Sequence, residues 1–124
     1  MESQMNKKLR IMIVDDNPHA RRALSAFIST QEWSEAVSEA SNGKDAVELI
    51  ESQIPDMILM DVQMPVMDGL EATQIIKGRW PQVKVIVLTI YMDYQLKAKT
   101  AGADAFLVKG CPMDEMTSII CSLN

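Results

Sequence analysis

The sequence predicts a doubly wound α/β fold in which helices cover both faces of a five-stranded parallel sheet. Five short apolar runs alternate strictly with five segments of helical periodicity along the 124 residues. The first run, residues 9–14, is apolar at nearly every position, which is typical of a strand buried on both faces. Because crossovers between parallel strands are right-handed, this alternation favours one open sheet between two layers of helices.

The first helix is expected directly after the strand at residues 9–14, where Asn17 can cap it and Pro18 occupies its first position. Its apolar face has the spacing i, i+3, i+4, i+7, i+8 and consists of Ala20, Ala23, Leu24, Phe27 and Ile28. The second strand, near residues 36–40, is more polar, so we expect it at an edge of the sheet. Residues 41–43 then turn the chain into the second helix.

The third strand is expected at residues 57–60, after Pro55 has ended the second helix. Asp61 follows this strand directly, although burial at the end of an apolar strand disfavours a charged carboxylate. The third helix starts at residues 68–69, an Asp-Gly pair, and the Trp-Pro pair at residues 80–81 ends it.

The fourth strand, residues 83–88, is rich in valine and is the strongest β pattern in the chain. The fourth helix is predicted over residues 92–100 and is closed by Gly102. The fifth strand follows at residues 105–108, and Pro112 opens the last helix. The residues of that helix predicted to face inward are Met113, Met116 and Ile120.

Polar side chains close four of the five strands. Asp15 and Asp16 follow the first strand, Asp61 the third, Thr89 the fourth and Lys109 the fifth. Parallel strands all end at the same edge of their sheet, and open α/β sheets bind ligands at that edge, where the strand order reverses. We therefore expect three carboxylates, a hydroxyl and an ammonium in one site.

Such a site is unfavourable without a cation, because two like charges about 4 Å apart repel by roughly 4 kcal/mol at an effective dielectric constant of 20. Carboxylate oxygens suit Mg²⁺, and Lys109 would hold Asp61 ionised. An ionised aspartate beside these cations can attack phosphorus. Each residue alone has a simpler interpretation, as a turn, helix-capping or surface residue. Because all of them are expected at one sheet edge, we prefer the interpretation as a phosphoryl-transfer site to the separate ones.

Composition excludes several other classes. The net charge of −5 disfavours direct nucleic-acid binding. No apolar run approaches the roughly 20 residues of a membrane span and the start is no signal peptide, so we expect a cytoplasmic protein. Cys111 and Cys121 fit no metal-binding spacing and are expected to be free thiols. His19 is expected on the surface of the first helix.

Four motifs resemble the receiver domain of two-component response regulators: IVDDNP (13–18), MDVQMPVMDG (60–69), VIVLT (85–89) and AGADAFLVKG (101–110). The resemblance covers essentially the whole chain and implies a receiver domain at residues 8–124 after a flexible tail, residues 1–7. It also implies the flavodoxin-like strand order 2-1-3-4-5.

The resemblance implies the role of each site residue. Asp61 resembles the phosphoacceptor, and Asp16 and Asp61 would contact Mg²⁺ directly. Asp15 would act on the ion indirectly, and the backbone carbonyl of Gln63 would be a further ligand. The resemblance also implies a conformational switch that responds to phosphorylation. In it, Thr89 would be the switch hydroxyl, Phe106 the switch aromatic ring and Lys109 the partner of the phosphoryl group.

The implied partner is a sensor histidine kinase or a phosphotransfer protein, with small phosphodonors as substitutes. Phosphorylation would remodel the face formed by the fourth helix, fifth strand and fifth helix. That face would control a protein partner or an output domain, with homodimerisation on activation. Residues 88–110 also resemble receivers of the NarL/LuxR type, which precede a helix-turn-helix domain. The chain is therefore expected to be either a stand-alone receiver or the N-terminal segment of a transcriptional regulator.

Three positions depart from the common receiver pattern. Gly110 stands where proline usually follows the lysine, and Pro112 lies two residues further on. Phe106 lacks the hydroxyl group of the frequent tyrosine. Ile90 follows the switch threonine in place of a small residue and is predicted to narrow access to the site.

Two enzyme or carrier classes fit poorly, and one alternative stays open. A phosphohydrolase of the haloacid dehalogenase type would need an aspartate where Gln63 stands. A flavodoxin-like flavin carrier would need a phosphate-binding first loop, where Asp15 and Asp16 would repel phosphate. A degenerate receiver that acts only as an interaction module remains. Met64 and Met67 could serve as partner contacts, although core packing is the commoner role of methionine.

Overall fold

The computed structural model describes residues 7–124, and the predicted flexible tail lies outside these residues apart from Lys7. The elements in chain order are β1 (Leu9–Val14), α1 (Pro18–Ser29), β2 (Ser34–Ala40), α2 (Gly43–Ser52), β3 (Met57–Asp61), α3 (Gly69–Arg79), β4 (Lys84–Thr89), the 3₁₀ helix η2 (Met92–Tyr94), α4 (Gln95–Ala101), β5 (Ala105–Val108) and α5 (Met113–Leu123).

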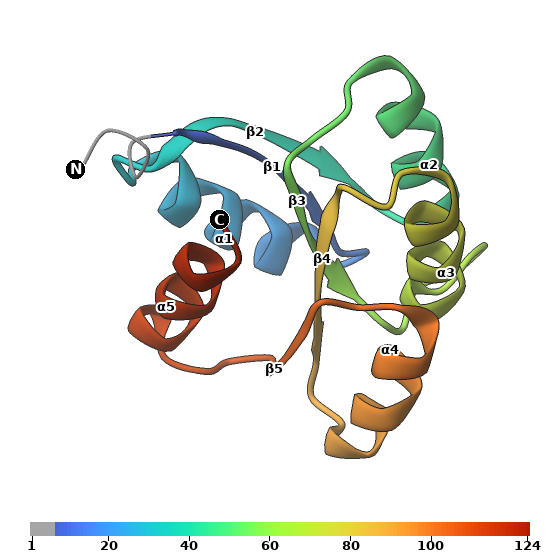
Figure 1. Ribbon diagram of the computed structural model, residues 1–124. Helices are drawn as coiled ribbons and strands as arrows, with labels where there is room; N and C mark the ends of the chain where they lie inside the picture. The colour runs from blue at the N-terminus through green and yellow to red at the C-terminus, as the bar shows by residue number, and fades with distance from the viewer. Residues whose placement is uncertain (1–6) are drawn as a thin grey trace.

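The sheet has the predicted topology. Its five strands lie in the order β2-β1-β3-β4-β5, and all four neighbouring pairs are parallel. Helices α1 and α5 cover one face of the sheet, and α2, α3 and α4 cover the other (Figure 1). The chain leaves β1 for the edge strand β2 and then returns to β3 on the other side of β1. The strand order therefore reverses between β1 and β3.

Each face of the sheet carries its own hydrophobic core, and β1 contributes to both. Ile11 and Ile13 pack in the cluster beneath α1 and α5. Met12 and Val14 pack in the cluster beneath α2, α3 and α4. A strand buried on both faces has no polar face to offer to water, which explains why its sequence lacks the alternation of a half-exposed strand.

Local chemistry sets the element boundaries largely as predicted. The side-chain oxygen of Asn17 accepts hydrogen bonds from the backbone N–H groups of His19 and Ala20 at the start of α1. Gly102 ends α4 in the left-handed conformation with φ of 102°. The predicted fourth helix differs in its first turn, where residues 92–94 form η2 before α4 begins.

The inward face of α5 is smaller than predicted. Met116 and Ile120 are buried, whereas Met113 is 42% exposed. Met113 is the first residue of the helix, and side chains of a first turn lean back toward the helix N-terminus. The prediction that Met113 faces the core is therefore wrong. His19 is exposed on α1 as predicted, and both cysteines are free thiols.

No helix within residues 7–124 has the length and hydropathy needed to cross a membrane.

A partly exposed ion pair fixes α3 to the start of β4 and the start of β5. The ammonium of Lys77 donates to the carbonyl oxygens of Pro81 (3.0 Å) and Val83 (2.8 Å) and to Asp104 (2.9 Å). The same Asp104 oxygen accepts from the N–H of Val85 at 2.8 Å. One lysine thus satisfies three acceptors, in the segments that precede β4 and β5.

Replacing Lys77 with methionine is expected to lower the free energy of unfolding by about 2 kcal/mol, because Asp104 and two carbonyl oxygens lose their cationic donor. Urea unfolding of the variant measures this change. Lys44→Met, at an exposed position of α2, is the control and is expected to change stability by less than about 0.5 kcal/mol. An equal loss in both variants would contradict the role of this ion pair.

Candidate functional site

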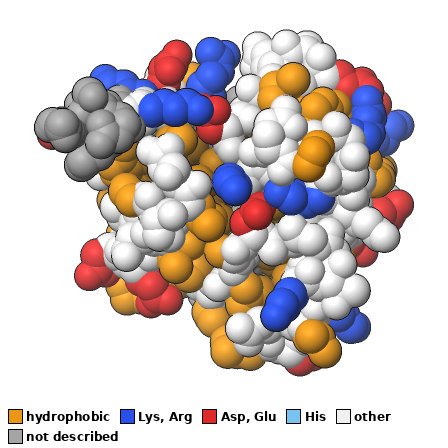
Figure 2. All heavy atoms as spheres, viewed as in Figure 1, with side chains coloured by type: hydrophobic (Ala, Val, Ile, Leu, Met, Phe, Trp, Pro, Cys, Tyr) orange, Lys and Arg blue, Asp and Glu red, His pale blue; other side chains and the backbone are white. Residues whose placement is uncertain are grey.

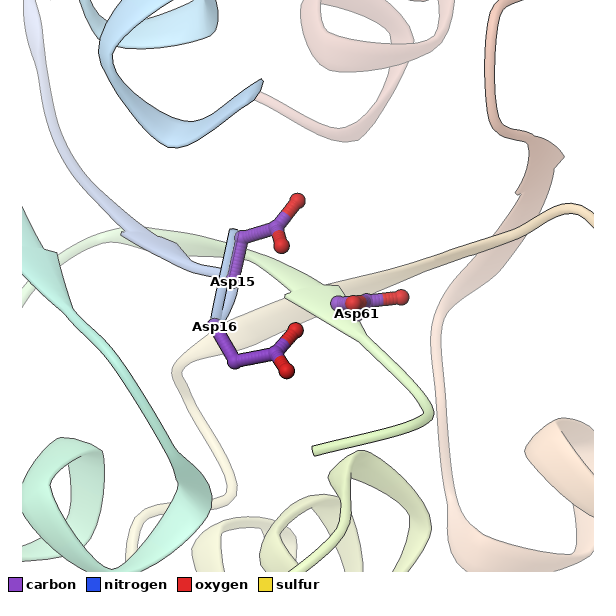
Figure 3. A group of neighbouring side chains, drawn as sticks. All are labelled: Asp15, Asp16 and Asp61. Carbon is purple, nitrogen blue, oxygen red and sulfur yellow. The ribbon is translucent and has the colours of Figure 1, made fainter. Parts of the chain in front are cut away.

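The strand ends place the three aspartates together, as predicted. Val14 lies beside Met60 in the register of β1 and β3, so Asp15 and Asp61 follow at equivalent positions of neighbouring strands. Figure 3 shows Asp15 and Asp16 projecting from the end of β1 toward the same side as Asp61 from the end of β3. One oxygen atom from each of the three carboxylates lies within 4.8 Å of the others.

Lys109 completes the cluster from the far side of β4. Its ammonium lies 2.7 Å from Asp15 Oδ2 and 3.3 Å from Asp61 Oδ2, so it bridges the two buried carboxylates. The backbone N–H of Lys109 donates to the carbonyl oxygen of Thr89 at 2.8 Å, which fixes the lysine at the end of the sheet. A lysine 48 positions from Asp61 in sequence is thus its nearest cation among the described residues.

Burial determines the electrostatics of Asp61. Its exposed fraction is 8%, and this desolvation raises the pKa of Asp61 to about 6; Lys109 lowers the pKa and the negative charge of Asp15 raises it further. Burial by itself would lower the pKa of Lys109, but the hydrogen bond to Asp15 and the charge of Asp61 outweigh burial and raise it. At neutral pH the site therefore holds a charged lysine beside an ionised, incompletely solvated aspartate.

Thr89 lies at the same sheet edge, and its hydroxyl is engaged locally. The residue is 2% exposed at the end of β4. Its Oγ1 accepts a hydrogen bond from the backbone N–H of Tyr91 at 3.2 Å. Ile90, between them, is exposed, and its predicted effect on access to the site stays a prediction.

The turn after β5 shows how Gly110 replaces the proline of the common pattern. The N–H of Cys111 donates to the carbonyl oxygen of Val108 at 3.0 Å, which closes a four-residue turn with Lys109 and Gly110 at its centre. Gly110 has a φ of 90°, a conformation that proline cannot adopt. The glycine thus permits a tight turn of trans peptide bonds that holds Lys109 over the site.

The other predicted residues lie around the cluster rather than in it. Phe106 is half-buried in β5 and packs against the core beneath α2, α3 and α4. The side chain of Gln63 is exposed, and its amide lies 3.3 Å from the hydroxyl of Tyr94. Met64 and Met67 are half-buried against the same core, so packing is their structural role here.

Two supporting residues were not singled out from the sequence. Arg21 of α1 donates to the carbonyl oxygen of Asp15 at 2.7 Å and pairs with Glu39 of β2 at 2.9 Å. Gly69, predicted only as a helix start, packs directly against the backbone of Asp61. Neither residue type carries a signal in a single sequence, because both act through backbone atoms of a neighbouring strand end.

A family model and the curated relatives match this chain to the same family. A family model described as the response regulator receiver domain matches residues 11–121. The transcriptional regulatory protein DegU of Brevibacillus brevis is 36% identical over 123 residues, which are 97% of this chain and 52% of that protein. The chain spans about half the length of the curated relatives that it matches.

Solved structures agree with the sequence comparison. The signal receiver domain of a NarL response regulator from Mycobacterium tuberculosis has a TM-score of 0.86 and 27% identity, with 94% of this chain and 95% of that chain covered. The response regulator TrrA of Thermotoga maritima, in complex with Mg²⁺-BeF, has a TM-score of 0.83 and 31% identity, with 93% and 98% covered.

Proposed function

The chain belongs to the response regulator receiver family of two-component systems, and on that premise we propose that a sensor histidine kinase phosphorylates it on Asp61 in a reaction that requires Mg²⁺. The observation that carries the proposal is the Lys109 ammonium between the buried carboxylates, 2.7 Å from Asp15 and 3.3 Å from Asp61. That arrangement provides a nucleophile and a fixed cation at the topological switch point of the sheet.

The donor set of the site fits Mg²⁺. All three side chains are carboxylates, one of them exposed, and they bring one oxygen each within 4.8 Å of the others. Asp16 and Asp61 are the proposed direct ligands with the backbone carbonyl of Gln63, and Asp15 acts indirectly. The bound ion would neutralise charge on the phosphoryl oxygens. The Mg²⁺ in the TrrA structure supports this assignment.

In the proposed transfer, a carboxylate oxygen of Asp61 attacks the phosphorus of a phosphohistidine. The phosphorus–nitrogen bond breaks, and the electron pair remains on the imidazole nitrogen of the kinase. Asp61 Oδ1 accepts a hydrogen bond from the backbone N–H of Val62 at 2.9 Å, which holds the carboxylate plane. The ammonium of Lys109, which already lies 3.3 Å from Oδ2, can form an ion pair with the phosphoryl group after the transfer.

The proposed switch starts at Thr89. Its hydroxyl accepts from the N–H of Tyr91 and keeps its own hydrogen as a donor for the phosphoryl group, so a movement of Thr89 toward the phosphoryl group would draw the loop after β4 with it. A hollow of about 240 Å³ lies between α4 and β5, and Phe106 lines it. This space would let the aromatic ring rearrange when the loop moves, which joins the site to the surface formed by α4, β5 and α5.

Exposed apolar side chains support a partner surface at this end of the molecule. Figure 2 shows hydrophobic side chains gathered where Figure 1 places η2 and α4. The large hydrophobic side chains exposed in this region are Ile90, Tyr91, Met92 and Leu96. We propose that this surface contacts an output domain in cis, a second receiver in a homodimer or another protein.

The proposed output is transcriptional and lies outside this segment, because DegU is a transcriptional regulator about twice as long. We place the protein in the cytoplasm, where it would meet its kinase. Neither nucleic acid nor membrane is a proposed direct partner of this receiver, whose net charge is −5.

Incubation with acetyl phosphate and Mg²⁺, followed by intact-mass measurement, tests the proposal. One added phosphoryl group is expected on the wild type and on Asp93→Asn, a control at an exposed aspartate of η2. Asp61→Asn and the wild type without Mg²⁺ are expected to show no adduct. An adduct on Asp61→Asn would overturn the assignment of the acceptor.

Beryllofluoride distinguishes the proposed function from the alternative, in which a degenerate receiver binds partners without phosphorylation. Since BeF₃⁻ replaces the phosphoryl group without a donor, the wild type with Mg²⁺ is expected to show shifted amide resonances around Thr89 and α4. If neither acetyl phosphate nor beryllofluoride had an effect, the interaction-only function would replace the proposed one.

A further inference from the structure

Arg21 joins three segments of the chain next to the acidic cluster. It lies in α1, its Nη1 donates to the carbonyl oxygen of Asp15 at 2.7 Å, and its Nε donates to Glu39 Oε1 of β2 at 2.9 Å. Only 16% of its side chain is exposed. A planar guanidinium held by two acceptors in this way has one orientation, so its contact with the Asp15 carbonyl is well defined.

The carbonyl that Arg21 holds belongs to the peptide bond between Asp15 and Asp16. Because a peptide unit is planar, fixing its oxygen also fixes the direction in which the chain enters Asp16. The Asp15 side chain has further support from the N–H of Asn17 at 2.9 Å and from Lys109. Among the described residues, none forms a hydrogen bond or ion pair with the exposed Asp16 side chain. Its placement therefore depends on the backbone.

We propose that Arg21, braced by Glu39, is a positioning residue for the metal site: it orients the Asp15–Asp16 peptide so that both carboxylates face the ion. This inference rests on the proposed function, because it takes the acidic cluster to be an Mg²⁺ site. Arg21 itself contacts neither the ion nor the phosphoryl group. Its effect reaches the site through the backbone of Asp15.

The charge of Arg21 and its orienting role predict opposite changes in Mg²⁺ affinity when the residue is replaced. A cation near three carboxylates repels Mg²⁺, so removing only its charge would strengthen Mg²⁺ binding. Removing a group that orients metal ligands weakens binding, typically by 10- to 100-fold. The direction of the change therefore separates the two roles.

Arg21→Met is expected to weaken Mg²⁺ binding about 10-fold in calorimetric titration of the 124-residue chain. The double variant Arg21→Met/Glu39→Gln keeps the net charge of −5 and is expected to show a similar loss. The control is Arg79→Met/Glu51→Gln, which removes an exposed pair of the same kind, with an N–O distance of 2.7 Å, from the ends of α2 and α3. It is expected to bind Mg²⁺ like the wild type.

Phosphorylation rates give a second readout that a general loss of stability would not produce. The Mg²⁺ concentration for half-maximal phosphorylation by acetyl phosphate is expected to rise about 10-fold in Arg21→Met, while the rate at saturating Mg²⁺ stays within about twofold. Arg21→Lys serves if the methionine variant does not fold, because it keeps the charge but lacks the planar fork. It is expected to bind Mg²⁺ several-fold more weakly than the wild type.

Unchanged or tighter Mg²⁺ binding in every folded Arg21 variant would overturn the positioning role and leave the proposed function intact. If the wild type itself bound no Mg²⁺, the metal-dependent function and this inference would both be wrong.

Discussion

Gly69→Ala is expected to lower the free energy of unfolding by about 3 kcal/mol and to impair phosphorylation of Asp61. A methyl group at this position would clash with the carbonyl oxygen of Asp61 and lie 2.8 Å from its carbonyl carbon. Both are backbone atoms of a central strand and cannot rotate away. The start of α3 must therefore move away from β3, which also breaks the hydrogen bond from Gly69 N–H to Val62, 2.8 Å long.

Gly78→Ala is the matched control, because it makes the same substitution in the same helix. Apart from its chain neighbours and the backbone of its own helix, no atom of residues 7–124 lies within 4 Å of a methyl group at Gly78. Alanine is favoured over glycine inside a helix, so this variant is expected to be more stable than the wild type by about 0.5–1 kcal/mol. Urea unfolding of both variants measures the two opposite changes. Similar stabilities for Gly69→Ala and the wild type would contradict the close packing of α3 on Asp61.

Asp61→Asn is expected to raise the free energy of unfolding at pH 7.5 in the absence of Mg²⁺ by about 1–2 kcal/mol. The pKa of Asp61 is raised from 3.8 to about 6 in the folded protein, so ionising this group costs folding free energy. A shift of that size corresponds to at most about 3 kcal/mol. Asparagine removes the charge but has one oxygen for the two donors, Val62 N–H and Lys109, so only part of this energy is recovered.

The pH dependence of this difference has a definite sign. Between about pH 4 and pH 6 the folded state binds more protons at Asp61 than the unfolded state does, so its contribution to stability falls as pH rises. The difference between Asp61→Asn and the wild type should therefore be largest above pH 6 and vanish toward pH 4. Unfolding in urea at a series of pH values measures it.

Asp93→Asn is the control for this series, because it removes the charge of an exposed aspartate. It is expected to change stability by less than about 0.5 kcal/mol throughout. A destabilising effect of Asp61→Asn at pH 7.5, or a gain that persists unchanged at pH 4, would show that burial does not oppose the charge of Asp61.

The fold and most of the site could be predicted from the sequence because both follow from order along the chain. Alternating strands and helices imply a parallel sheet, and parallel strands all end at one edge. That argument alone brings Asp15, Asp61 and Lys109 to the same side, and the structure places them within ion-pair distance. The polar pattern of β2 likewise predicted its place at the edge of the sheet.

Features that depend on packing were not predictable in the same way. Met113 and the 3₁₀ turn before α4 lie where helices begin, and helical periodicity carries little information in a first turn. The roles of Arg21 and Gly69 depend on the carbonyl oxygens of Asp15 and Asp61, which have no signature in the sequence.

The sequence by itself determined which chemical groups meet at this sheet edge, because strand order and residue type are properties of the chain. Only the tertiary structure decided how those groups act. The raised pKa of Asp61 depends on how much water the surrounding side chains exclude, and the position of Lys109 depends on a left-handed turn at Gly110. Desolvation and the directions of backbone atoms are set by contacts between distant segments, which exist only in the folded protein.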